Sequence, residues 1–295
     1  MEKDIKLQYF ERLIAANYSD KFFIEQYLHG SGNELVSKFW KESSSSRLCF
    51  DLYSWLCNVQ SVSNFQFEKK LIGVRYSNNR TATPPNMDAY FEKGQDIFFI
   101  ESKYTEKNTW EYMDDNKKEH SLSEAYWKEG GYKTCRLNIG ERFYDRPDIA
   151  MQFITFCKTI QKEINERREK ELKKYLWFDP KQETCHLFGI IFYAINNQLK
   201  NKHLYLCNNV WNCNKTEDCF VLEDSIVGSF KDKAETMLNR ILEEYECKFT
   251  FEVNTIQEIL EKGFKGLDFP KAKLFATKEE NLVEYIRRMY TMDNR

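Results

Sequence analysis

Residues 88–105 contain two strand-like segments that are separated by a turn. Residues 96–105 (DIFFIESKYT) form an apolar run that ends in charged residues, and a Gly-Gln turn separates them from a shorter strand-like segment, 88–92. Residues 65–76 are also strand-like. A short turn joins strands that pair antiparallel. The pattern therefore predicts a hairpin over 88–105, preceded by another strand over 65–76.

Apolar residues recur at helical spacing in other parts of the chain. This spacing predicts helices over 3–28, over 33–59 as one broken helix or two, over 148–176 and over 231–246. Three further apolar segments are predicted to be strands: 184–194 (TCHLFGIIFYA) as a buried strand, then 203–207 and 248–253.

Several helix starts carry signals of their own. The serine run Ser43–Ser46 marks a helix start or a kink. Thr255 with Glu258, and Thr277 with Glu280, have the spacing of capping boxes, in which two residues satisfy each other's backbone N–H groups. These pairs predict helices that begin near residues 255 and 277.

The order of these elements is a helix, three strands, a long helix, a strand, and then a further strand and helices. This order predicts an α/β fold with a central mixed β-sheet flanked by helices. We expect one domain over residues 31–295, preceded by an N-terminal helical extension over residues 1–30.

Composition restricts the classes of protein that are possible. The 295 residues are 42% hydrophobic and carry a net charge of −2, so any nucleic-acid-binding surface must be local. There is no apolar run of about 18 residues that would span a membrane, and the N-terminus lacks the features of a signal peptide. We therefore expect a cytoplasmic protein. Its nine cysteines are expected to be free thiols.

The candidate chemistry lies at the end of the 96–105 strand. Glu101 and Lys103 share one face there, and Asp88 begins the preceding strand, so the hairpin can bring Asp88 close to Glu101. Two carboxylates supply hard oxygen ligands for Mg²⁺, and a metal lowers the pKa of a bound water. A lysine beside them can orient that water and offset developing charge. Phosphodiester hydrolysis needs this set of groups.

The acid–any–Lys spacing is not specific by itself. It recurs at Glu171–Lys173 and Glu246–Lys248, where no apolar strand precedes it. The alternative interpretation of Glu101 and Lys103 is an exposed strand end that carries a surface ion pair. The apolar strand, the turn and the upstream Asp88 together favour a site.

Asp88…Glu101-Ser102-Lys103 resembles the PD-(D/E)XK signature of restriction-endonuclease-like nucleases, with Pro85-Asn86-Met87-Asp88 in place of the literal Pro-Asp. The chain is similar to bacterial restriction-endonuclease-like proteins of comparable length. The matching segments are 44–56, Phe67-Glu68, NMDAYF, 97–106, EGGYKTC and FEVNTIQEIL.

This resemblance implies a restriction-endonuclease-like core and an Mg²⁺- or Mn²⁺-dependent endonuclease that cuts DNA, in bacterial antiviral defence or DNA processing. Asp88 and Glu101 would be metal ligands and Lys103 the catalytic lysine. Restriction-type enzymes often form homodimers, so the oligomeric state stays open between a monomer and a homodimer. The same fold is also compatible with a catalytically inactive nucleic-acid-binding or assembly module, and with a nuclease that acts on RNA.

Other residues are candidates for supporting roles. Glu68 could be a third acidic ligand or a helper, and Glu34 or Glu42 could supply a helix carboxylate. Residues 106–145 are polar and irregular. Residues 103–136 interleave basic and aromatic side chains, as in a nucleic-acid-facing loop, but acidic residues are equally dense there. Lys107, Lys133 and Arg136 are the candidate DNA contacts in this loop.

Two more patterns bear on metal or nucleotide binding. His203, Cys207, Cys213 and Cys219 are residue types that zinc binds, but they lack a CxxC pair, so ordinary strand and loop cysteines are the competing interpretation. Gly130-Gly131 lacks the pattern of a phosphate-binding loop, so no nucleotide cofactor is expected.

Overall fold

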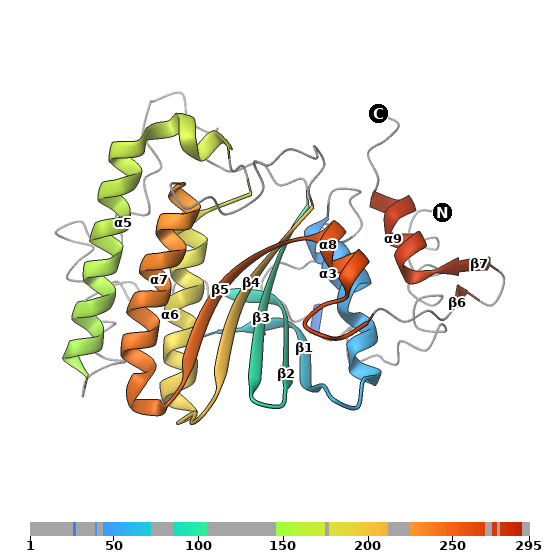
Figure 1. Cartoon of the computed structure of the whole chain (residues 1–295), viewed down its shortest axis with the longest axis horizontal. Helices are drawn as coiled ribbons and strands as arrows, with labels where there is room; N and C mark the ends of the chain where they lie inside the picture. Colours follow the sequence, from blue (N-terminus) through green and yellow to red (C-terminus); the bar gives the residue numbers. More distant parts are fainter. Residues whose placement is uncertain are drawn as a thin grey trace.

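The central feature of the fold is a mixed five-stranded sheet, which confirms the predicted α/β class (Figure 1). The computed structural model describes residues 26–27, 39, 44–71, 85–104, 146–174, 177–211, 225–268, 273–275 and 278–290. In spatial order the strands are β1 (Ser63–Lys70), β2 (Asn86–Lys93), β3 (Asp96–Lys103), β4 (His203–Val210) and β5 (Lys248–Thr255). The β1–β2 and β2–β3 pairs are antiparallel, and the β3–β4 and β4–β5 pairs are parallel.

Helices cover both faces of this sheet (Figure 1). Parallel neighbours need long crossover connections, and three long helices supply them on one face. These are α5 (Pro147–Lys174) and α6 (Pro180–Asn196), between β3 and β4, and α7 (Ile226–Leu242), between β4 and β5.

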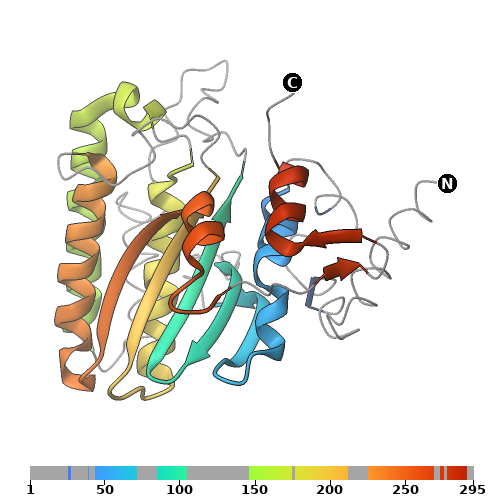
Figure 2. The same cartoon turned by 45° about the vertical axis from the view of Figure 1, so that its right-hand side comes forward.

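The other face carries shorter elements. These are α3 (Ser45–Tyr53) with the 3-10 turn η2 (Ser54–Asn58), α8 (Ile256–Lys262) and α9 (Leu282–Tyr290). Helix α9 packs on α3, and the small hairpin of β6 (Lys273–Phe275) and β7 (Lys278–Asn281) lies beside α9 (Figure 2).

Strand β3 separates two hydrophobic cores. Ile97 and Phe99 belong to the core under α5, α6 and α7, whereas Phe98 and Ile100 belong to the core under α3, α8 and α9. Because both faces are buried, the strand is apolar on both sides until its end. The polar residues that follow Ile100 are therefore placed at a junction between the two cores.

The strongest sequence patterns correspond to real elements. The predicted hairpin at 88–105 is β2–β3, the predicted helix at 148–176 is α5, and the predicted helix at 231–246 is the body of α7 followed by the 3-10 turn η6 (Glu243–Tyr245). Ser44 caps α3 by accepting a hydrogen bond from the Arg47 backbone N–H at 3.1 Å. The capping box of Thr255 and Glu258 is present at the start of α8.

Two predicted elements are wrong. Residues 184–194 are not a strand but the body of α6, because a helix buried between a sheet and two other helices is apolar on most sides and loses the helical periodicity. Glu280 does not lie in the first turn of a helix, because β7 spans Lys278–Asn281 and α9 begins at Leu282.

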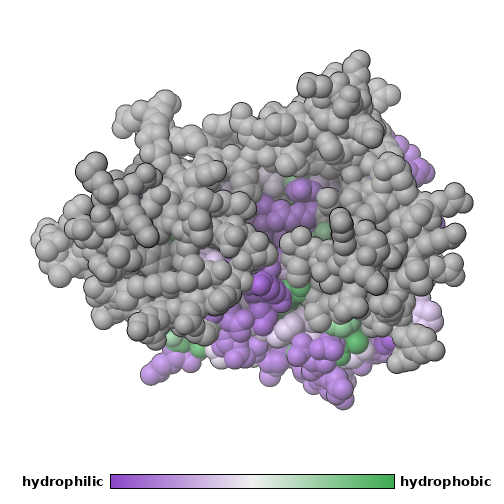
Figure 3. Space-filling view, turned by 180° about the vertical axis from the view of Figure 1, so that it is seen from behind, coloured by the Kyte–Doolittle hydropathy of each residue, from purple (hydrophilic) through white to green (hydrophobic). Residues whose placement is uncertain are grey.

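The turns at the lower end of the sheet are polar. Seen from behind, the described residues at that end are mainly hydrophilic (Figure 3).

Among the described residues, no helix combines the length and hydrophobicity that crossing a membrane requires. Of the predicted extension over 1–30, only Gln26 and Tyr27 are described, and Tyr27 is fully buried in the α3-side core.

Candidate active site

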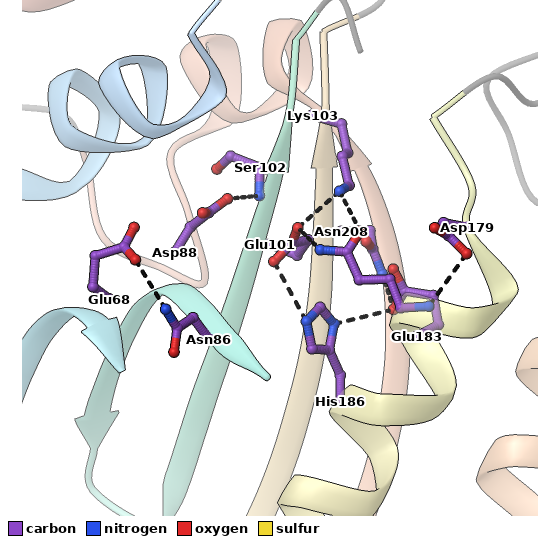
Figure 4. A network of polar contacts seen from close by, with 11 residues as sticks. Glu68, Asn86, Asp88, Glu101, Ser102, Lys103, Asp179, Glu183, His186 and Asn208 are labelled. Carbon is purple, nitrogen blue, oxygen red and sulfur yellow. Dashed lines mark hydrogen bonds and ion pairs between the residues drawn. The ribbon is translucent and has the colours of Figure 1, made fainter. Parts of the chain in front are cut away.

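Three strand ends bring the predicted acidic residues to one edge of the sheet. Strand β2 is antiparallel to both neighbours, so its amino end lies beside the carboxyl ends of β1 and β3. Glu68 lies near the end of β1, Asp88 near the start of β2, and Glu101 and Lys103 at the end of β3 (Figure 4). These residues therefore lie at the same edge of the sheet.

Asp88 lies where β2 and β3 separate. The ladder between them runs from the turn to the pair Ala89–Ile100 and pairs no residue beyond it. There the Asp88 carboxylate accepts a hydrogen bond from the Ser102 backbone N–H at 2.7 Å. A backbone N–H of an antiparallel strand points sideways toward its neighbour. The carboxylate therefore takes the place of a β2 carbonyl between the two strands.

The pleat of β1 and β2 is interrupted at the same place. Phe67 and Ala89 face the α3-side core, but Met87, two residues from Ala89, faces the α6-side core. Glu68 has φ +50°, an uncommon value for a residue other than glycine. Conformations of this kind persist where the surrounding structure enforces them, often at functional sites. Glu68 and Asp88 thus sit at a local distortion shared by two strands.

The surroundings disfavour the charged form of Asp88. Burial raises the pKa of its carboxyl well above the ordinary value, and the nearby Glu101 and Glu68 carboxylates raise it further. The hydrogen bond from Ser102 and the Lys103 ammonium act in the opposite direction, but they do not outweigh these effects. A cation at this edge of the sheet would offset the accumulated negative charge.

Glu101 and Lys103 form a buried ion pair rather than an exposed one. Both residues are 4% exposed, and the Lys103 ammonium donates to Glu101 Oε1 at 2.8 Å. The alternative of a solvated surface pair is therefore wrong. Buried charges are costly unless they are paired and hydrogen-bonded, and the surrounding side chains supply these bonds.

The first turn of α6 supplies Gln182, which fixes the ion pair from the other side. Gln182 Nε2 donates to Glu101 Oε1 at 2.7 Å, and Lys103 donates to Gln182 Oε1 at 2.7 Å. Asp179 precedes α6 and accepts from the Gln182 backbone N–H at 3.3 Å. The two side-chain bonds of Gln182 join the start of α6 to the end of β3, and the Asp179 bond fixes the first turn of α6 itself.

A second polar layer lies deeper, where α6 faces β3 and β4. The His186 ring lies between two carboxylates, with Nε2 3.8 Å from Glu101 Oε2 and Nδ1 3.8 Å from Glu183 Oε2. Asn208 on β4 donates to Glu183 Oε2 at 3.2 Å. Burial lowers the pKa of His186, but the two carboxylates outweigh this effect and raise it above its ordinary value.

The two predicted metal ligands flank the β3 backbone. Asp88 lies with Ser102 on the side toward α3, and Glu101 lies on the side toward α6 (Figure 4). They are nevertheless close enough for Glu101 to raise the pKa of Asp88. Within the described residues, no three His, Cys, Asp or Glu side chains form a group that could hold a metal ion.

Mg²⁺ retains several waters and needs only one or two protein carboxylates. Among the described residues, Glu101 Oε2 is buried and receives no hydrogen bond. This oxygen and the Asp88 carboxylate have the chemistry that such an ion binds, and the residues present fit it in this respect.

Several sequence candidates lie outside the described residues. These are Lys107, Lys133 and Arg136 of the predicted nucleic-acid loop, the helix carboxylates Glu34 and Glu42, and two members of the proposed zinc set, Cys213 and Cys219. The remaining two zinc candidates are four residues apart on β4, which separates them by roughly 13 Å. His203 and Cys207 therefore cannot share one ion.

Sequence reasoning missed Gln182, Glu183 and His186. Their spacing places them on one face of a helix, but this signal is visible only once residues 180–196 are recognised as helical. Because residues 184–194 were predicted to be a strand, the helical face that these three residues share was not recognised.

The comparisons with known proteins add no relative to this picture. No family model matches the chain, and no curated protein and no solved structure matches it.

Proposed function

We propose that this chain is a metal-dependent nuclease of the PD-(D/E)XK kind that hydrolyses phosphodiester bonds in DNA. The observation that carries the proposal is the buried Glu101–Lys103 pair at the end of β3, with the Asp88 carboxylate bound to the backbone N–H of the residue between them. Two acids and a lysine thereby lie around the end of β3, at one edge of the sheet.

The order of elements supports the same proposal. Helix α3, strands β1, β2 and β3, a helical crossover and β4 follow the restriction-endonuclease-like order, with the two helices α5 and α6 forming the crossover. A role in defence against foreign DNA or in DNA processing follows from this resemblance.

We assign a role to each of three residues and a supporting role to Glu68. Asp88 and Glu101 would hold Mg²⁺, which would supply an activated water and stabilise charge on the phosphate. Lys103 would orient the attacking water and offset negative charge that develops at phosphorus. Glu68, close enough to raise the pKa of Asp88, would add to the negative potential that attracts the cation.

A catalytically inactive nucleic-acid-binding module is the second candidate. The observation that favours it is the placement of Asp88 and Glu101 on opposite sides of β3 (Figure 4). In such a module the ion pair would only stabilise the fold, and no cleavage would depend on Asp88.

A cleavage assay separates these candidates. Plasmid DNA and a structured RNA are incubated with the protein and Mg²⁺ or Mn²⁺, and Asp88→Ala and Lys103→Ala are compared with Asp96→Asn. Asp96 is a matched control because it lies at the opposite end of β3. The proposal predicts metal-dependent cutting of DNA that both site variants abolish and Asp96→Asn retains. Absence of cutting by the wild type, or cutting that both site variants retain, contradicts it, and preferential cutting of RNA corrects the substrate.

A further inference from the structure

The two oxygens of the Glu101 carboxylate have different surroundings. Oε1 receives two hydrogen bonds, from Lys103 and Gln182. Oε2 receives no hydrogen bond from the described residues, and the ring of His186 lies beside it at 3.8 Å. His186 is therefore placed where it can restrict the orientation of this oxygen.

His186 is itself held from behind. It is 1% exposed, and its second ring nitrogen faces Glu183, which is fully buried and bound to Asn208 of β4. A buried carboxylate such as Glu183 is costly without partners. Contacts run from Asn208 on β4 through Glu183 and His186 to Glu101. The buried Glu183 therefore supports the ring of His186.

We propose that His186, supported by Glu183, is a positioning residue that orients Glu101 for divalent-metal binding. This inference rests on the proposed function. Side chains behind a metal ligand fix its orientation, and their loss typically weakens metal affinity about 10- to 100-fold. In the network drawn in Figure 4, dashed lines join the ring of His186 to Glu101 and Glu183 and not to Asp88, so it acts through Glu101.

The first test measures Mn²⁺ affinity by electron paramagnetic resonance on the full-length protein. His186→Leu removes the ring nitrogens, and His186→Gln restores a donor. Thr184→Val is the matched control, because Thr184 is a buried α6 residue whose hydroxyl donates to the Pro180 carbonyl of its own helix. We expect His186→Leu to weaken Mn²⁺ binding about 10-fold or more, His186→Gln to recover part of the loss, and Thr184→Val to match the wild type.

The second test needs no metal and no activity. A double-mutant cycle of His186→Leu and Glu101→Gln in chemical unfolding with EDTA measures the coupling between the two side chains. Without coupling, the change in the unfolding constant of the double variant equals the product of the changes in the two single variants. We expect it to differ from that product by more than about twofold.

The outcomes keep the two proposals apart. Zero coupling in the cycle, or unchanged Mn²⁺ affinity in a folded His186→Leu protein whose Glu101→Gln counterpart has lost binding, overturns the role of His186. If Glu101→Gln binds Mn²⁺ as the wild type does, the proposed metal site fails, and with it the metal-positioning role of His186. Coupling in the cycle would then report only a structural contact.

Discussion

Asp88 illustrates how one residue can serve function at the expense of stability. Burial and two neighbouring acids raise the pKa of its carboxyl, which disfavours the charged form, yet the same carboxyl accepts the Ser102 N–H that β2 leaves unpaired. Active-site groups commonly carry a stability cost of this kind. The two effects can be separated, because an asparagine keeps the acceptor and removes the charge.

We predict that Asp88→Asn raises the free energy of unfolding by about 1 kcal/mol in EDTA while it abolishes cleavage. Asp88→Ala also loses the charge, but it leaves the Ser102 N–H without its partner, which costs about 1–3 kcal/mol. Urea unfolding of the three proteins measures the difference. An Asp88→Asn protein that is clearly less stable than the wild type would contradict the proposed repulsion between Asp88 and the Glu101 and Glu68 carboxylates.

His203 provides a test of pH dependence away from the site. Its ring stacks on Tyr205 and contacts Thr250 Oγ1 and the Tyr205 hydroxyl, both at 2.8 Å. Burial lowers its pKa below the ordinary value. The folded state then binds a proton less readily than the unfolded state, so the stability due to His203 is complete above the unfolded pKa and falls as the pH drops toward the folded pKa.

We therefore predict that acidification from pH 7.5 to 5.5 lowers the melting temperature of the wild type more than that of His203→Gln. Thermal melts at several pH values in EDTA measure this. Parallel pH profiles for the two proteins would show that His203 does not contribute.

The secondary elements differ in how far the sequence could predict them. Strand β3 was predictable because its apolar run ends abruptly at Glu101 and Lys103, and this also located the site. Helix α6 was not, because its buried residues, such as Leu187, Phe188 and Ile191, occupy positions that a buried strand would also fill with apolar residues. Only tertiary packing distinguishes the two, and it is this packing that places Gln182 and His186 beside Glu101.

Gly189 lies where α6 packs closely against Leu71 and Pro85, which flank β1 and β2. A Cβ at this position would lie 2.7 Å from Leu71 Cβ and 3.2 Å from Pro85 Cγ. Alanine would gain about 1 kcal/mol of helix propensity, but overpacking costs about 1–3 kcal/mol.

We predict that Gly189→Ala is destabilising by about 1 kcal/mol and lowers cleavage, because the displaced helix moves Gln182 and His186 from Glu101. Urea unfolding and the plasmid assay measure the two effects. A stabilised and fully active variant would show that the helix can shift without consequence.

The outer edge of β5 is protected by side chains from α7. Asn239 accepts from the Phe249 N–H at 2.7 Å and donates to the Phe249 carbonyl at 3.0 Å, and Glu235 accepts from the Phe251 N–H at 2.9 Å. Unpaired strand edges tend to pair with other chains. These bonds occupy the groups that such pairing would use.

We predict that Asn239→Leu lowers the free energy of unfolding by about 1–3 kcal/mol and promotes concentration-dependent self-association. Thr236→Ala, at an exposed position of the same helix, is the control. Urea unfolding and light scattering over a range of protein concentrations measure both effects. A monomeric Asn239→Leu protein with wild-type stability would contradict the role of Asn239 at this edge.

A ligand that binds only the folded state raises the free energy of unfolding of the whole molecule. The candidate metal ligands come from different strands, so the unfolded chain does not hold them together, and a cation that binds them must stabilise the entire cooperative unit. A ligand at 100 times its dissociation constant adds about 2.7 kcal/mol to the free energy of unfolding.

We predict that Mn²⁺ or Mg²⁺ at saturating concentration stabilises the wild type by about this amount, and that Asp88→Asn and Glu101→Gln remove most of the gain. Asp88→Asn is expected to be the more stable protein in EDTA. Its advantage in free energy of unfolding over the wild type should therefore shrink or change sign when metal is added. Urea unfolding with and without metal measures both states of each protein. Ca²⁺, which favours more oxygen ligands than Mg²⁺, provides a comparison ion. Equal stabilisation of the wild type and both variants would place the ion elsewhere on the molecule and would remove the physical basis for a catalytic role of Asp88.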